Sequence, residues 1–311
     1  MKRLLLFLLA AAAGSLCADV TVRYKSEIKS PFMQAMPGEM QAQLQSMMPS
    51  STSTRVKGNK GISEMGWMSA IMDLSAHQIV LLNNTGKKYA ISADDQYTKS
   101  VTQSVPEVPE AARAALASPK TKTETNVTGR TATIQGIEAE EREIVTTIDG
   151  PTMPGMPPIS IRMVMQVWMA KASEVDRVPA LKELAAYTSA NYSTFNPMGT
   201  LQKMLAMLPG AGDSMTSLIA EMTRKDSVMM RMHIEMFMPM LAELAKMAPA
   251  GASPLPEFDA NAPLFQINQE VTELSTAPVT DSVFQVPADY EKQPIDEFMK
   301  SLLAKFVPAA K

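Results

Sequence analysis

Residues 227–239 read SVMMRMHIEMFMP, and this stretch decides the fold. Apolar side chains occupy every second position from Val228 to Met238, and most of the residues between them are polar. Successive side chains of a β-strand point to opposite faces, whereas a helix would place apolar residues three or four positions apart. The stretch therefore predicts a strand with a methionine-lined apolar face and a mostly polar face that carries Arg231, His233 and Glu235.

The same two-residue period marks other segments of the chain. Residues 20–30 and 159–170 alternate in this way, and residues 264–275 predict a further long strand. Residues 121–134 and 138–149 predict a long hairpin that turns at Gln135-Gly136. Shorter strands are expected at 52–60, 67–74, 77–82 and 87–92. Because most connections are short, the strands are expected to pair with antiparallel neighbours.

Helical periodicity is confined to fewer segments, of which residues 178–223 are the longest and residues 240–247 and 295–307 are shorter. A sheet with one oily face must either close on itself or be covered. The predicted fold class is therefore α+β, with a large curved antiparallel sheet, a half-open barrel, and helices that cap its concave face. Residues 178–223 are expected to form a lid over that face.

The N-terminus is typical of a secretory signal peptide. Lys2 and Arg3 precede an apolar run and a small residue, Ala18, after which cleavage is expected. The run is shorter than the roughly 20 residues that a membrane-spanning helix needs. The protein is therefore expected to be periplasmic or secreted. The expected organisation is a signal peptide at 1–18, a single sheet domain at 19–290 with the helical insert 178–223, and a C-terminal helix at 291–311.

Cys17 is the only cysteine of the chain. Acylation of Cys17 would make the protein a lipoprotein, but Leu16 stands before it where a small residue is usual. Cys17 is expected to leave with the signal peptide, so that the mature chain forms no disulfide. Loss of Lys2 and Arg3 takes the formal net charge from −3 to −5. With no basic patch and no later apolar run of spanning length, neither a nucleic-acid partner nor a transmembrane segment is expected.

No motif in the sequence predicts catalysis or a bound cofactor. His77 and His233 are the only histidines, and they lie in different predicted strands. The nucleophile elbow, the phosphate loop and the dinucleotide fingerprint are all missing from the sequence. Arg231, His233 and Glu235 could form a polar site, but a solvated strand face with cross-strand pairs is the simpler interpretation. We therefore expect no enzyme, no cofactor and no metal centre.

The 27 methionines are the remaining clue to function. Thioethers bind Cu(I), but His233 lies on the face opposite to the methionines, so an apolar lining is the favoured interpretation. Methionine is flexible and polarizable, which suits an adaptable apolar surface. Whether the lining surrounds an open cavity or a filled core stays open. The residues predicted to line it are Met163, Met165, Val167, Met230, Met232, Ile234 and Met236.

Several short segments follow one another in a familiar order. They are TRVKG at 54–58, IMDL at 71–74, QIVLLN at 78–83, KY at 88–89, TG at 128–129, IQGIEAEE at 134–141, VWMA at 167–170 and FQVPADY at 284–290. This order resembles small exported bacterial proteins of unknown function, which are similar to the outer-membrane lipoprotein carrier and receptor superfamily. The resemblance implies a half-open barrel with helices in its mouth and a hydrophobic cavity for acyl chains. The insert at 178–223 and the methionine excess depart from that pattern, and no functional residue carries over.

Two functions of different classes follow from these observations. The first is an exported, non-catalytic protein that holds a lipid or acyl chain in a cavity lined by its sheet. The alternative is a structural or interaction module of the cell envelope, with a filled core, no ligand and another envelope protein as partner.

Overall fold

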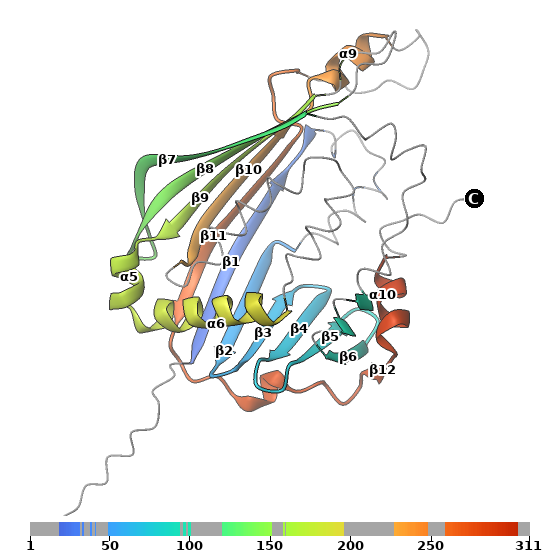
Figure 1. Cartoon of the computed structure of the whole chain (residues 1–311). Helices are drawn as coiled ribbons and strands as arrows, with labels where there is room; N and C mark the ends of the chain where they lie inside the picture. Colours follow the sequence, from blue (N-terminus) through green and yellow to red (C-terminus); the bar gives the residue numbers. More distant parts are fainter. Residues whose placement is uncertain are drawn as a thin grey trace, which may run out of the picture.

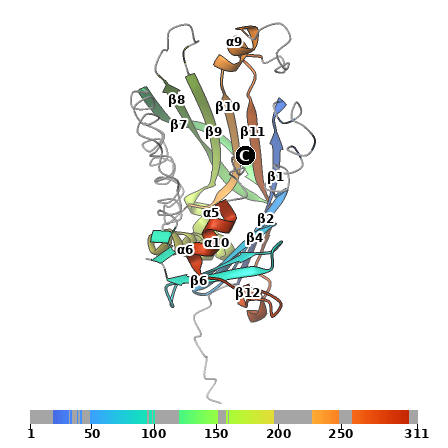
Figure 2. The same ribbon diagram turned by 90° about the vertical axis from the view of Figure 1, so that its right-hand side faces the viewer.

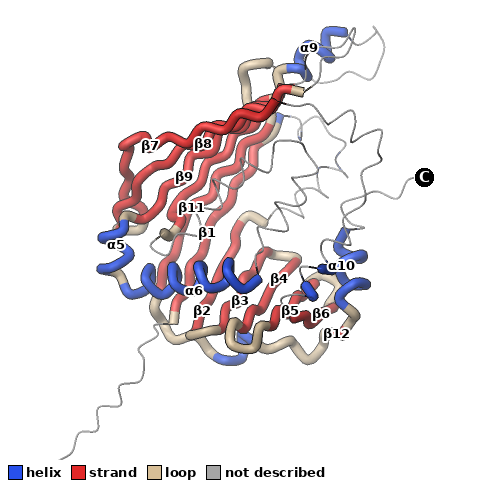
Figure 3. The backbone as a smooth tube through the Cα atoms, in the orientation of Figure 1, coloured by secondary structure: helices blue, strands red, loops and turns tan. Residues whose placement is uncertain are grey.

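The computed structural model describes residues 19–30, 49–93, 120–150, 160–195, 227–247 and 259–303, and the isolated residues 31, 33, 38, 41, 96, 97, 99, 100 and 158. All twelve strands in this part of the chain belong to one sheet (Figures 1 and 3). The predicted signal peptide at 1–18 and the predicted insert beyond residue 195 lie outside the described residues.

The strand order brings strands from distant parts of the sequence together. Along the sheet the order is β12-β6-β5-β4-β3-β2-β1-β11-β10-β9-β8-β7, so that β1 pairs with both β2 and β11. β7 and β12 lie at opposite edges, and the described sheet is not closed. The strands are β1 (Val20–Lys29), β2 (Ser51–Lys57), β3 (Lys60–Met65), β4 (Met68–Asp73), β5 (Gln78–Asn83), β6 (Lys88–Ala93), β7 (Lys120–Ile134), β8 (Ile137–Asp149), β9 (Ser160–Ala170), β10 (Met229–Phe237), β11 (Phe265–Ser275) and β12 (Glu291–Lys292).

The expectation of a purely antiparallel sheet is wrong at one edge. β12 pairs with β6 in parallel, whereas every other neighbouring pair is antiparallel. A tight hairpin forces its strands to run antiparallel, but a long connection leaves the direction free. Residues 276–290, here named the strap, make such a long connection between β11 and β12.

The turns explain why the sequence predicts the long hairpin of β7 and β8 but not β3. Gln135 and Gly136 both have positive φ, 50° and 76°, as a tight two-residue hairpin between right-twisted strands requires. The sequence does not predict β3, because residues 52–60 are expected to form one strand and the next strand is expected only at 67–74. The chain instead turns at Gly58 and Asn59 and pairs again at once, with Lys57 opposite Lys60.

The helices are α5 (Ala172–Arg177), α6 (Pro179–Phe195), α9 (Met240–Met247) and α10 (Ile295–Leu303), with a short 3₁₀ turn η1 (Asp281–Phe284) in the strap. The predicted helices at the start of the insert, at 240–247 and from residue 295 are thus confirmed. α6 starts with Pro179, a residue suited to the first helical position because its missing N–H would have no partner there. α6 and α10 lie at the same end of the long strands, beside β2 to β6 (Figures 1 and 2).

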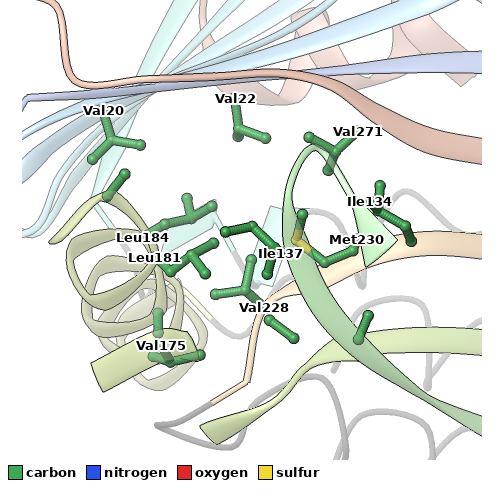
Figure 4. Close-up of a cluster of buried hydrophobic side chains, with 14 of the residues drawn as sticks. Val20, Val22, Ile134, Ile137, Val175, Leu181, Leu184, Val228, Met230 and Val271 are labelled. Atoms are coloured by element: carbon green, nitrogen blue, oxygen red, sulfur yellow. The ribbon is translucent and has the colours of Figure 1, made fainter. Parts of the chain in front are cut away.

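The described core consists of separate clusters of apolar side chains, and in three of them a helix or the strap packs against the sheet. Leu181 and Leu184 of α6 pack with Val20 and Val22 of β1 and with Met230 (Figure 4). In the short-strand half, Ile295, Phe298, Met299 and Leu302 of α10 cover Ala70, Met72, Ile79, Leu81 and Ala90. Val283, Phe284, Val286 and Tyr290 of the strap pack with Ile62, Ile71 and Leu82. Because residues 70 and 72 alternate with residue 71 along β4, α10 and the strap cover opposite faces of the short strands.

Candidate functional site

The candidate site begins with the apolar face predicted from the methionine pattern. Met163 stands opposite Met236, Met165 opposite Ile234 and Val167 opposite Met232 in the β9–β10 ladder. Cross-strand partners project from the same face of a sheet, so six of the seven predicted lining residues share one surface. Met165 and Val167 are each 3% exposed, and the other four are half-buried.

Two further methionines extend this surface along the strands. Met169 stands opposite Met229, and both pack in one apolar cluster with Ile144, Met165 and Val167. We name these residues the methionine face. It consists of Met163, Met165, Val167, Met169, Met229, Met232, Ile234 and Met236.

Met230, the seventh predicted residue, lies in a different cluster. The β9–β10 register shifts between Met229 and Arg231, so that one extra residue enters β10. Met230 is fully buried in the core beneath α6, where Figure 4 shows it with Ile137 and Val271. A bulge disturbs the two-residue period locally, which the sequence alternation does not reveal.

A cavity of about 200 Å³ lies between α6 and the strands beneath it. Its walls combine apolar side chains with hydroxyl and amide groups, and they come from six separate parts of the sequence. Among the described residues, the lining consists of Val22, Tyr24, Thr54, Ser63, Met169, Leu184, Tyr187, Thr188, Asn191, Tyr192, Ser227, Val228 and Met229. We name this cavity the α6 pocket. None of the seven predicted lining residues belongs to it.

Among the described residues that line the α6 pocket, two buried polar groups have no hydrogen-bonding partner. Tyr187 is only 5% exposed, and its hydroxyl is a buried group without a partner, as is Oδ1 of Asn191. The hydroxyl of Tyr24, in contrast, donates to the carbonyl oxygen of Met229 at 3.3 Å. A buried polar group without a partner is costly, and native structures contain few of them. The α6 pocket therefore offers two unused hydrogen-bonding positions.

The tyrosines of the α6 pocket keep their protons. Burial raises the pKa of Tyr24, Tyr187 and Tyr192 above the usual tyrosine value, because desolvation disfavours the phenolate. The negative charge of Asp73 raises the pKa of Tyr187 further. At neutral pH these side chains are thus neutral hydroxyls that can donate and accept hydrogen bonds.

The position of Tyr187 depends on a glycine in β3. A methyl group at Gly61 would overlap the hydroxyl and the ring of Tyr187, so only a residue without a Cβ allows the ring to lie there. Gly61 pairs with Val56 on one side and with Met72 on the other. The sequence pattern does not predict this role of Gly61. The signal in the sequence was Tyr187 itself. It lies three residues after Leu184 on the apolar stripe of the helix, and it carries a polar hydroxyl.

The α6 pocket and the methionine face share two residues. Met169 and Met229 line the pocket, and both belong to the same apolar cluster as Val167, Met232 and Ile234 farther along the strands. Polar groups without partners therefore lie at one end of a continuous apolar surface.

The opposite face of β10 is polar, and its side chains pair with neighbouring strands. Nδ1 of His233 lies 2.6 Å from Oδ1 of Asn268, and Nε2 lies 3.3 Å from Oε1 of Glu235. Arg231 pairs with Glu270 at 2.5 Å, and its guanidinium lies 5.3 Å from the ring centre of Trp168. These contacts agree with the interpretation of this face as a row of cross-strand pairs. Met232 also borders a second hollow, of about 340 Å³, lined mainly by polar side chains of β1, β10 and β11.

Within the described part of the chain, no group of three or more His, Cys, Asp or Glu side chains is arranged to hold a metal ion. No described helix combines the length and the apolar character needed to cross a membrane. Comparison of the chain with protein-family models and with curated proteins gave no match.

Proposed function

We propose that the protein binds an amphipathic, lipid-like ligand without transforming it. The apolar chain of the ligand lies along the methionine face, and its polar end enters the α6 pocket. One observation carries this proposal. The partnerless groups of Tyr187 and Asn191 lie in a pocket that continues, through Met169 and Met229, into a row of apolar side chains.

The dimensions of the surface suit such a ligand. From Met169 to Met163 the strand advances six residues, or about 20 Å at the usual rise of a β-strand. This is the order of length of an extended long-chain acyl group. Methionine side chains can adapt to chains of different length and unsaturation, because they are unbranched and flexible.

The expected cellular location supports a carrier or receptor outside the cytoplasm. Residues 1–18 have the features of a signal peptide. The short motifs between residues 54 and 290, taken in their order along the chain, resemble the lipoprotein carrier and receptor superfamily. The half-open barrel of that superfamily would hold the chain on the concave side of a curved sheet. In this proposal α6 covers the ligand, and Leu181 and Leu184 hold α6 against the sheet.

The first test is chemical extraction of the purified protein followed by mass spectrometry of the extract. The proposal predicts co-purifying lipid in stoichiometric amount. After delipidation, a long-chain acyl probe with an environment-sensitive fluorophore at its apolar end should bind saturably. Reproducibly clean extracts together with no probe binding would instead favour the envelope module with a filled core.

A pair of variants on α6 localises the site. Thr188 lines the α6 pocket, whereas Ala186 is exposed on the same helix. Thr188→Trp should fill the pocket and weaken probe binding at least roughly tenfold, a loss of about 1.4 kcal/mol. Ala186→Trp adds the same side chain outside the pocket and should bind as the wild type does. Equal binding by both variants, with unchanged melting temperatures, would place the ligand elsewhere.

A further inference from the structure

We propose that the α6 pocket accepts an uncharged, hydrogen-bonding head group, such as the hydroxyls of a monoacylglycerol or the amide of a fatty amide, and discriminates against a carboxylate or phosphate. This inference rests on the proposed function, because it specifies the polar end of the same ligand.

The described residues that line the pocket carry no formal charge. None of its described residues is an aspartate, glutamate, lysine, arginine or histidine. An anionic head group would therefore lose its hydration without gaining a cationic partner, which is strongly unfavourable in a buried site. The negative charge of Asp73 raises the pKa of Tyr187 and would also repel an anion bound beside it.

The unused hydrogen-bonding groups require a donor from the ligand. Oδ1 of Asn191 only accepts, whereas the hydroxyl of Tyr187 both donates and accepts. An alcohol or a primary amide can donate to Asn191 and accept from Tyr187 at the same time. An ionised carboxylate only accepts, so it would leave Oδ1 of Asn191 without a partner. Charge and hydrogen bonding thus select the same class of head group.

The experiment compares ligands that share one acyl chain and differ in head group. Monolauroylglycerol and dodecanamide are titrated by calorimetry into delipidated protein at neutral pH, beside dodecanoate and lauroyl lysophosphatidic acid. The neutral pair should bind at least roughly tenfold more tightly than the anionic pair, a difference of about 1.4 kcal/mol. Equal or tighter binding of the anions would overturn the head-group assignment while leaving the proposed function intact.

Three variants test the residues themselves. Tyr187→Phe removes only the hydroxyl and should weaken binding of monolauroylglycerol and dodecanamide, because both ligands hydrogen-bond to it. Tyr89→Phe, in the cluster beneath the strap, is the matched control and should have no effect on either. Asn191→Lys places a cation in the pocket and should reverse the preference toward dodecanoate.

Thr188→Lys provides the same charge from another position of the pocket if Asn191→Lys does not fold. An undiminished affinity for the neutral ligands in Tyr187→Phe, together with an unchanged neutral preference in a folded lysine variant, would overturn the assignment. If none of the four ligands binds the wild type and extracts are clean, the proposed function itself fails.

Discussion

At the scale of single residues, the contact between Gly61 and Tyr187 links the fold to the α6 pocket. Tyr187 carries one of the two partnerless groups, and its ring occupies the space that a side chain at position 61 would need. The glycine is therefore required by close packing, since its φ is not among the positive values of this chain. Backbone and aromatic ring meet here without room for a methyl group.

Gly61→Ala should consequently destabilise the protein by about 1–3 kcal/mol, the usual cost of overpacking a core. Tyr187→Ala alone should also destabilise, because it empties a buried site. The double variant should be more stable than the sum of the two single losses predicts, since the small side chain relieves the overlap. Urea unfolding measures all three, with Ser63→Ala on the same strand as control. Strictly additive losses would show that the two residues do not interact.

At the scale of elements, the strap is held by ion pairs as well as by its apolar contacts. Lys57 of β2 lies 2.7 Å from Asp281 and donates to the carbonyl oxygen of Val279 at 3.1 Å. Lys87 lies 2.7 Å from Asp289. Hydrogen bonds from these lysines lower the pKa of Asp281 and of Asp289 below the ordinary value of 3.8. Each carboxylate therefore favours the folded strap only while it is ionised.

A carboxyl group with a lowered pKa contributes stability above its unfolded pKa and loses it as the pH falls through the folded value. The double variant Lys57→Met/Lys87→Met should thus melt below the wild type at pH 7. The gap should narrow as the pH falls below 3.8, where both carboxyl groups become protonated. The effect should be small, because the pairs are exposed to solvent. Melting curves from pH 7 to acid measure the difference in melting temperature, with exposed Lys292→Met as the control. A difference that does not depend on pH would contradict a role of the two ion pairs in holding the strap.

At the scale of the whole molecule, the C-terminal part of the chain connects the centre of the sheet with one of its edges. β11 pairs with β1 near the centre, the strap covers one face of the short strands, and α10 covers the other. β12 then adds to the edge beside β6. Pairings between such distant parts of the sequence carry an entropic cost, because they close long loops.

Truncation after Asp289 should expose the apolar surface that α10 covers. Phe298 of α10 packs against this surface and is fully buried among Met72, Ile79 and Leu81. The truncated protein should bind a hydrophobic dye and associate in size-exclusion chromatography. Phe298→Ala in the full chain should cost about 3–5 kcal/mol, and exposed Lys300→Ala should cost little. A truncated protein that remains monomeric, dye-free and cooperative in unfolding would show that α10 is dispensable to the core.

The local pattern of the sequence determined most of the elements. Alternation identified the long strands, and β10 with its methionine face in particular, because a strand projects its side chains with a period of two whatever its partners are. The Gln135-Gly136 turn and the apolar stripe that begins α6 are also local properties. Six of the seven predicted lining residues share one face for the same reason.

Only the tertiary structure decided how these elements meet. Met230 does not lie on the predicted surface, because a bulge forms in β10 against β9. Glu141 can be fully buried because Arg130 and Thr128 of β7 bind its carboxylate. The parallel β12 and the α6 pocket likewise arise where segments far apart in the sequence pack together. A sequence period reports the direction of each side chain relative to its own backbone. Which other segment that side chain contacts is set by pairing and packing over the whole chain, and no local period contains that information.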